Sequence, residues 1–244
     1  MENSETQILK KSAAENAVEE IKDGMIVGLG TGSTAKFAIE SLAKKIKEGK
    51  LKNIYGVPTS NKTKELAIQL GIPVISLNEC YKKLSSENIN DLKPIDITID
   101  GADEVDSELN LIKGGGGALL REKVIAQNTK SFLVVVDESK LSDKLGEKFF
   151  VPVEVLQFAL ESEKSFLESL GAKVVLRKNN DEPFLTDEGN FILDVYFGKI
   201  ENPAELSSIL NERAGIVEHG IFLNKLVDKV YCSSHNGIKI LSVS

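Results

Sequence analysis

The segment with the most chemically active side chains runs from Asp100 to Glu122. It begins with the acidic stretch DGADE (100–104), continues to Lys113, and then contains four consecutive glycines (114–117) before a helix-like run that carries Glu122. Carboxylates can take and return protons, and an ammonium group can stabilise an oxyanion. Consecutive glycines allow a tight bend around a small ligand, at an entropic cost. This set suits proton transfer next to a carbonyl group, and does not suit hydride transfer or nucleophilic acyl chemistry.

Glu122 is the candidate base. At 100° per residue it shares an apolar helical stripe with Ala118, Leu119, Ile125 and Ala126. Desolvation in such a stripe raises the pKa of a carboxyl group toward neutrality, where the group can both accept and return a proton. The alternative is a glutamate paired with a lysine or arginine at the edge of the stripe.

A second glycine-rich stretch, GLGTGSTA from Gly28, follows a strand-like run and opens a helix-like one. Backbone N–H groups at a helix N-terminus favour an anion, and the hydroxyls of Thr31, Ser33 and Thr34 add donors for a phosphate group. A dinucleotide site is disfavoured, because Ser33 replaces the small third residue of that fingerprint and the next strand ends in VPTSN without an acidic residue. The Gly-Lys-Ser/Thr ending of a P-loop is absent. A loop that only turns the chain remains an alternative.

Apolar periodicity outlines the elements that must position these residues. A helical pattern over 8–21 is expected to stop at Gly24, and helical runs then alternate with strand-like runs at 25–30, 53–60, 72–77, 95–100 and 131–137. This alternation predicts an α/β fold with a mostly parallel sheet and helices on both faces, which is Rossmann-like. Ligands of such sheets bind at the carboxyl ends of the strands, so Asp100 and the loop after Gly28 should meet there. The acidic stretch by itself would also fit a solvated loop.

The pattern changes near Phe149. Strand and helix signals then follow in the order β-α-β-β-α-β, which is typical of a small α+β split-βαβ (ferredoxin-like) module, and Asn202-Pro203 marks the start of its second helix. Asn236-Gly237 predicts a C-terminal hairpin that returns to the first sheet. We therefore expect a first domain of residues 1–148, completed by 225–244, with a second domain inserted at 149–224.

Composition narrows the range of partners. A chain of 244 residues that is 41% hydrophobic can bury a sizeable core, and its net charge of −7 argues against affinity for nucleic acid or anionic membranes. No apolar run approaches the ~20 residues of a membrane span, and residues 1–7 lack the apolar segment of a secretory signal. Cys80 and Cys232 have neither metal-ligand spacing nor a disulfide framework. These features predict a cytoplasmic protein with reduced thiols and no bound metal.

GTGSTA, DGADE and KGGGGALLREK, in this order and spacing, resemble the motifs of type A ribose-5-phosphate isomerases, and PVEV, LDV and NPAEL extend the resemblance over nearly the whole chain. The resemblance implies interconversion of D-ribose 5-phosphate and D-ribulose 5-phosphate through an enediolate, in the non-oxidative pentose phosphate pathway. It implies no metal or organic cofactor. It also implies a homodimer or homotetramer whose inserted domain is a cover and an oligomer contact.

By motif position, the resemblance makes Glu122 the base that moves a proton between C1 and C2. Asp100, Asp103 and Lys113 would bind sugar hydroxyls and stabilise charge, and Asp100 would help to open the furanose ring. The substrate-binding residues implied in the same way are Lys10, Thr31, Gly32, Ser33, Thr34, Gly101, Ala102, Gly114, Gly115, Gly116 and Lys140.

Two departures from the family pattern are expected to matter little. Gly117 stands where some relatives have alanine, and the stretch from Cys80 to Pro94 should lengthen a surface loop.

Other functions fit parts of the pattern. A sugar-phosphate sensor would use the same loops without turnover, but it gives no reason for a base at Glu122, and nothing resembles an attached basic DNA-binding helix pair. An amino-sugar phosphate deaminase would offer a catalytic histidine, and an acyl-CoA transferase a nucleophilic glutamate on a different motif. His219 lies in a strand pattern and His235 beside a turn, so neither is expected to be catalytic.

Overall fold

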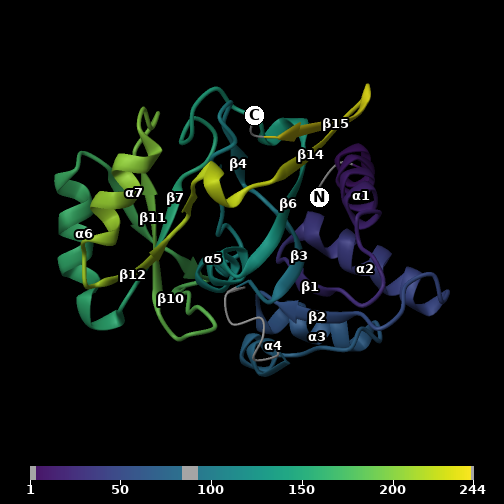
Figure 1. The fold of residues 1–244 in the computed structure, drawn as a ribbon. Helices are drawn as coiled ribbons and strands as arrows, with labels where there is room; N and C mark the ends of the chain where they lie inside the picture. The colour runs from purple at the N-terminus through teal and green to yellow at the C-terminus, as the bar shows by residue number, and fades with distance from the viewer. Residues whose placement is uncertain (1–3, 84–92, 243–244) are drawn as a thin grey trace. The chain divides into compact units, whose positions relative to one another are not determined.

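The computed structural model describes residues 4–83 and 93–242. The chain divides into two compact units. Figure 1 labels many of the helices and strands that form them. The first unit is built from the described parts of 1–101, 121–139 and 225–244, and the second from 102–120 and 140–224. The second unit contains the whole predicted insertion, and the domain boundaries expected from the sequence stay predictions.

The first unit contains a six-stranded sheet in the order β15-β14-β6-β3-β1-β2. Five strands run parallel to one another, namely β1 (Ile26–Leu29), β2 (Tyr55–Pro58), β3 (Ile95–Gly101), β6 (Thr129–Asp137) and β14 (Lys229–Ser234). The last strand, β15 (Gly237–Ser242), is antiparallel to β14 and follows the predicted turn at Asn236-Gly237. The predicted α/β class and the C-terminal hairpin are confirmed.

Helices cover both faces of this sheet. Val27 and Leu29 of β1 pack in one cluster with α1 (Ser4–Val18) and α2 (Ser33–Lys47). Gly28 lies between them and faces the other way, toward Ile125 of α5 (Leu119–Gln127), because alternate strand residues point to opposite faces. The edge strand β2 is followed by α3 (Asn61–Gln69) and α4 (Leu77–Lys83). None of the helices in the described ranges has the length and apolar character that a membrane span requires.

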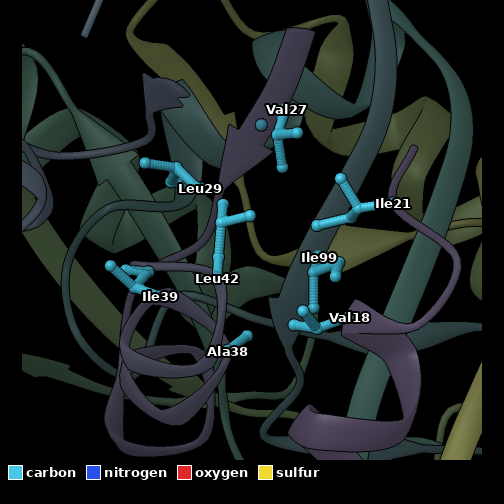
Figure 2. Close-up of a pocket in the computed structure, with 9 residues that line it drawn as sticks. Val18, Ile21, Val27, Leu29, Ala38, Ile39, Leu42 and Ile99 are labelled. Atoms are coloured by element: carbon cyan, nitrogen blue, oxygen red, sulfur yellow. The ribbon is translucent and has the colours of Figure 1, made fainter. Parts of the chain in front are cut away.

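The core between α1, α2, β1 and β3 contains a small cavity of about 10 Å³ (Figure 2). Its lining is apolar and includes Val18, Val27, Leu42 and Ile99. A space of this size holds at most one water molecule, and an apolar lining offers that water no partner. The cavity is a packing defect of the core and cannot accept a phosphorylated sugar.

Two local expectations for the first unit are wrong. The helical pattern from Ile8 ends at Val18 and not at Gly24, because the N–H groups of residues 19–21 bond to carbonyls three residues back and tighten the last turn. Residues 72–77 form no strand. Only an isolated bridge joins Val74 to Gly56, and Pro73 has no N–H group to extend a ladder. A surface loop was expected after Cys80, and its central part, residues 84–92, lies outside the described residues.

The second unit confirms the predicted β-α-β-β-α-β order. Its four-stranded antiparallel sheet has the order β12-β7-β11-β8. The elements along the chain are β7 (Val151–Val155), α6 (Leu160–Ser169), β8 (Lys173–Leu176), β11 (Phe191–Tyr196), α7 (Pro203–Asn211) and β12 (Ile216–His219), with the short pair β9 (Lys178–Asn179) and β10 (Glu182–Pro183) before β11. The side chain of Asn202 accepts the Glu205 N–H at 3.2 Å and caps α7, as predicted.

The two faces of this sheet differ in character. Val153 of β7 and Leu193 of β11 belong to the apolar cluster that α6 and α7 complete. The alternate residues Glu154 and Asp194 are buried on the other face. Burial raises the pKa of Glu154, although Thr186 Oγ1 at 2.8 Å and Asn190 Nδ2 at 2.9 Å donate to its carboxylate and oppose that rise. This second face therefore carries buried carboxylates with side-chain partners.

A three-stranded sheet completes the second unit. It consists of β4 (Glu104–Val105), β5 (Leu111–Ile112) and β13 (Ile221–Phe222), in the order β13-β5-β4. The apolar run 216–223 does not form one continuous strand, because the chain leaves β12 at Gly220 and then pairs with β5. A Cβ atom at Gly220 would lie 2.7 Å from Cδ of Pro152, so glycine allows this crossing between the two sheets.

Candidate active site

The first glycine loop and Asp100 meet at the carboxyl ends of β1 and β3. The Gly30 N–H donates to Ile99 O at 3.0 Å, and a Cβ atom on Gly30 would lie 2.6 Å from Cα of Asp100. Only glycine permits this approach. The structure therefore confirms that two segments distant in sequence are brought to one edge of the sheet.

The Asp100 carboxylate is fixed by the loop. The side chain is buried, and its Oδ1 accepts the N–H of Thr31 at 3.0 Å and that of Gly101 at 2.8 Å. Hydrogen bonds from backbone N–H groups to a carboxylate are among the stronger ones in proteins. Asp100 thus has a defined orientation before any ligand arrives.

Lys10 of α1 reaches the start of α2 with its side chain. Its ammonium group donates to Ser33 Oγ at 2.9 Å, and the residue is buried. Ser233 of β14 holds the same part of α1, because its hydroxyl donates to Leu9 O at 2.7 Å. Gly32, with φ = 110°, and Ser33 are exposed, so the backbone at the helix start is open to an anion.

The Thr31 hydroxyl has a different role from the one expected. It donates to Ser60 Oγ at 2.9 Å, Ser60 donates to Thr63 Oγ1 at 3.0 Å, and Thr63 donates to Gly30 O at 3.0 Å. Thr59 Oγ1 lies 2.8 Å from the same Thr31 hydroxyl. This hydroxyl chain ties the loop after β1 to the loop after β2, so Thr31 contributes to loop structure through its side chain.

Sequence reasoning missed Thr59, Ser60 and Thr63 as partners of the glycine loop. Their local signal is that Ser60 caps α3, since its hydroxyl accepts the Thr63 N–H at 3.0 Å. The sequence TSNKT is compatible with that cap, but nothing in it shows that Thr31 completes the network.

Glu122 is buried on α5, as the apolar stripe predicts. Leu119, Ile125 and Ala126 on the same stripe are also buried. The end of the helix lies at the start of β6, where Thr129 Oγ1 donates to Ile125 O at 2.7 Å. At the other end of the helix, Arg121 Nη1 donates to Asn61 Oδ1 at 3.0 Å, just after the carboxyl end of β2. The helix therefore runs antiparallel to the strands, and Glu122, one turn before Ile125, is nearer to the carboxyl edge.

In the second unit, Asp103 and Lys113 lie at the same end of the β4–β5 pair. The register joins Glu104 to Ile112, so Asp103 precedes one strand where Lys113 follows the other. The Asp103 N–H donates to Ile112 O at 2.8 Å. Lys113 is buried at 2% exposure, and its Nζ lies 5.5 Å from the centre of the Phe222 ring.

Three of the four glycines have structural reasons to be glycine. Gly114 and Gly117 have φ of 101° and 81°, which side chains rarely adopt. The Gly115 N–H donates to Asp103 Oδ2 at 2.7 Å, and a Cβ atom there would lie 2.7 Å from Oδ1. A Cβ atom on Gly117 would lie 2.5 Å from the Phe184 ring. Glycine therefore fits at 117, and an alanine there would be strained in this chain.

The last carboxylate of the acidic stretch is structural. Glu104 is fully buried and accepts the N–H groups of Gly146 at 2.9 Å, Lys148 at 3.0 Å and Phe149 at 3.2 Å. Three backbone donors fix the loop that leads into β7. A carboxylate with these partners is suited to holding that loop.

Three further residues predicted for the site lie next to the elements already described. Thr34 is in the first turn of α2, and Ala102, next to Gly101 in sequence, is half-buried in the second unit. Lys140 ends the short 3₁₀ turn Glu138–Lys140 after β6 and is half-buried. Within the first unit the structure thus joins Lys10, the 30–34 loop, Asp100 and Gly101, and within the second it joins Asp103, Lys113 and the glycines.

Neither histidine has the surroundings of a catalytic base. His219 is buried, its Nδ1 accepts the Ile221 N–H at 3.2 Å, and its Nε2 lies 3.1 Å from Ser207 Oγ. His235 is on the surface, 3.5 Å from Glu5. Among the described residues, no three His, Cys, Asp or Glu side chains are grouped to hold a metal ion.

A glycine loop that opens a helix beside a fixed carboxylate, at the carboxyl edge of a parallel sheet, is typical of α/β proteins that bind phosphorylated small molecules. The family model of ribose 5-phosphate isomerase A (phosphoriboisomerase A) matches residues 55–237. The chain belongs to this family.

Proteins of known family are similar to this chain over most or all of its length. Ribose-5-phosphate isomerase A of Desulfatibacillum aliphaticivorans is 56% identical over 88% of this chain and 89% of its own, and that of Chloroflexus aurantiacus is 43% identical over 100% and 97%. A solved D-ribose-5-phosphate isomerase in complex with phospho-erythronic acid has a TM-score of 0.89 at 41% identity, over 97% of this chain and 99% of that one. The Plasmodium falciparum structure has a TM-score of 0.88 at 39% identity, over 97% and 98%.

Thr31→Val tests the hydroxyl chain. The substitution keeps the shape of the side chain but leaves Ser60 without its donor, so we expect unfolding to become easier by about 1–2 kcal/mol, measured by urea denaturation. Thr34→Val is the matched control, because the Thr34 hydroxyl in the first turn of α2 makes no hydrogen bond among the described residues, and its effect should stay within about 0.5 kcal/mol. Equal effects of the two substitutions would contradict the structural role of Thr31.

Proposed function

We propose that this chain is an aldose-ketose isomerase that interconverts D-ribose 5-phosphate and D-ribulose 5-phosphate in the non-oxidative pentose phosphate pathway. Membership of the ribose 5-phosphate isomerase A family supports the substrate class. The observation that carries the chemistry is the burial of Glu122 on α5, one turn from the residue that packs beside Gly28. A shielded carboxylate can accept a proton from carbon and return it.

The phosphate group is assigned to the start of α2. Its backbone N–H groups, the hydroxyls of Ser33 and Thr34 and the Lys10 ammonium supply donors and positive charge. Lys140 is proposed as a second cation for the same group. Thr31 and Gly32 contribute through the backbone, which the hydroxyl chain and Asp100 hold in place.

The proposed reaction proceeds through an enediolate. In the open-chain aldose, the Glu122 carboxylate takes the proton from C2, the electron pair forms the C1–C2 double bond, and O1 becomes an oxyanion. Glu122 then returns the proton to C1, the hydroxyl at C2 loses its proton, and O2 becomes the ketone oxygen. Protons balance because O1 gains the proton that O2 loses.

Asp100, Asp103 and Lys113 are assigned to the oxygen atoms of the substrate. Lys113 stabilises the oxyanion that develops in the transition state. Asp103 and Asp100 bind hydroxyls and carry protons between oxygens, and Asp100 also helps to open the furanose ring. Gly101, Ala102 and Gly114–Gly116 line the substrate with backbone that side chains do not obstruct.

Glu122→Gln tests the base. Glutamine keeps the size of the side chain but does not accept a proton, so kcat should fall about 100-fold or more while ribose 5-phosphate binding changes little. Rates are measured by conversion to ribulose 5-phosphate and binding by calorimetry. Normal turnover by this variant would remove Glu122 from the mechanism. In D₂O, the wild-type protein should exchange the C2 proton with solvent during isomerisation. Complete transfer of that hydrogen to C1 without exchange would instead require an internally transferred proton or a hydride shift.

Lys113→Met tests the oxyanion contact. Methionine preserves the buried stem of the side chain and removes the charge, so kcat should fall by a larger factor than KM rises. Steady-state kinetics with ribose 5-phosphate measures both. An equal change in binding and turnover would make Lys113 a substrate anchor and not a transition-state group.

Activity should survive exhaustive treatment with EDTA, because the proposed mechanism gives every proton transfer to side chains of the chain itself. The assay is isomerisation before and after chelation, with the chelator removed by gel filtration. Loss of activity that a divalent cation restores would contradict the expected absence of a metal.

We also propose a cytoplasmic homodimer or homotetramer in which the second unit supplies contacts between copies, and no nucleic-acid or membrane partner. Its support is the set of apolar side chains exposed on that unit, where Phe158 is 100%, Leu185 53% and Tyr196 45% exposed. Large exposed apolar side chains are favoured at contacts between proteins. The mass of the protein in solution decides between the two assemblies.

A further inference from the structure

One peptide group of the glycine loop is held at both ends by charged side chains. The Gly115 N–H donates to Asp103 Oδ2 at 2.7 Å. The carbonyl oxygen of the same peptide group, that of Gly114, accepts from Arg177 Nη1 at 2.9 Å. The oxygen and hydrogen of a trans peptide point in opposite directions, so Arg177 and Asp103 lie on opposite sides of it. Arg177 Nη1 also lies 3.2 Å from Gly115 O.

Arg177 is itself held from several directions. Its Nε lies 3.1 Å from each Asp194 carboxylate oxygen, and Nη2 also donates to Oδ1. The guanidinium carbon lies 5.7 Å from the centre of the Phe150 ring and 5.9 Å from that of Phe184. The side chains of Arg177 and Asp194 are largely buried, at 11% and 13% exposure. A buried, paired guanidinium of this kind has little freedom to leave the loop.

The loop needs such a constraint because glycine does not provide one. A peptide group between two glycines turns over easily, since no Cβ atom resists the rotation. In the inverted orientation the Gly114 carbonyl would face the Asp103 carboxylate, and the Gly115 N–H would face the guanidinium. Both charge-assisted hydrogen bonds would be replaced by repulsion. The two charges therefore select one of the two orientations.

We propose that Arg177, fixed by Asp194, is a positioning residue for Asp103 and acts through the Gly114–Gly115 peptide. The inference rests on the proposed function, in which Asp103 binds a substrate hydroxyl and carries its proton. Arg177 does not touch the substrate. Its loss lets the peptide turn over and releases the Asp103 carboxylate, and a displacement of about 1 Å in a catalytic group can cost about 100-fold in rate.

Two substitutions and a matched control separate positioning from folding stability. Arg177→Ala should lower kcat by up to about 100-fold, with a smaller change in KM. Arg177→Lys keeps the charge but cannot hold the carbonyl and Asp194 together, so it should also lower kcat. Arg213→Ala is the control in the same unit, because Arg213 pairs with Glu163 at 2.9 Å and lies 4.4 Å from the Phe166 ring in a similar way. It should lower the melting temperature and leave kcat unchanged.

A double-mutant cycle tests whether Arg177 acts through Asp103. Asp103→Asn alone should lower kcat, and adding Arg177→Ala to it should lower kcat little further, because the group that Arg177 positions is already disabled. A general structural role predicts instead that the two losses multiply. The cycle is measured with wild type, both single variants and the double variant, each checked for folding by thermal melting. If Arg177→Ala does not fold, Arg177→Lys takes its place in the cycle.

The outcomes separate the positioning role of Arg177 from the proposed function of the protein. If Asp103→Asn lowers kcat and the losses multiply, or if the Arg177 variants retain wild-type kcat, the positioning role is overturned and the proposed function stands. If Asp103→Asn leaves kcat unchanged, the role of Asp103 itself is wrong and the positioning role fails with it. Overlapping losses, with normal kcat in Arg213→Ala, support the proposal.

Discussion

Carboxylates of one five-residue segment, 100–104, accept backbone N–H groups from loops that are distant in sequence. Asp100 accepts the N–H of Thr31, Asp103 that of Gly115, and Glu104 those of the loop 146–149. A buried carboxylate without partners is costly, so each loop must bring its N–H groups to a fixed place. The acidic segment therefore determines the conformation of both glycine-rich loops, and the charges proposed for chemistry also have structural tasks.

This arrangement explains where glycine is required. Gly30 and Gly115 approach Asp100 and Asp103 so closely that a Cβ atom would lie within 3 Å of the aspartate. Those two positions serve the contact with the carboxylate before any ligand is considered. The freedom that glycine adds is then removed by partners, namely the hydroxyl chain at Thr31 in one unit and the Arg177–Asp194 pair in the other. These partners hold the backbone N–H groups of the two glycine-rich loops in fixed positions.

The sequence predicted the features that depend on local periodicity and on general topology. The burial of Glu122 follows from its helical stripe, and the meeting of Asp100 with the first glycine loop follows from the parallel sheet. The partners of Thr31 and the contact of Arg177 with the Gly114 carbonyl could not be predicted, because each joins residues 29 or 63 positions apart without a local pattern. The strand predicted at 72–77 is wrong for another reason: a bridge joins Val74 to Gly56 of β2, but Pro73 has no N–H group to extend the pairing.

The number of backbone donors separates the roles of the carboxylates. A carboxylate offers about four acceptor positions. Glu104 uses three of them on backbone N–H groups, whereas Asp103 receives one backbone N–H, from Gly115, among the contacts of the described residues. Asp103 therefore keeps acceptor capacity for the hydroxyls proposed as its ligands, while the three bonds of Glu104 hold the loop 146–149. Glu122 differs from both because a helix, not a loop, sets its position, and this suits the role proposed for it, that of a base that faces one carbon and then its neighbour without moving far.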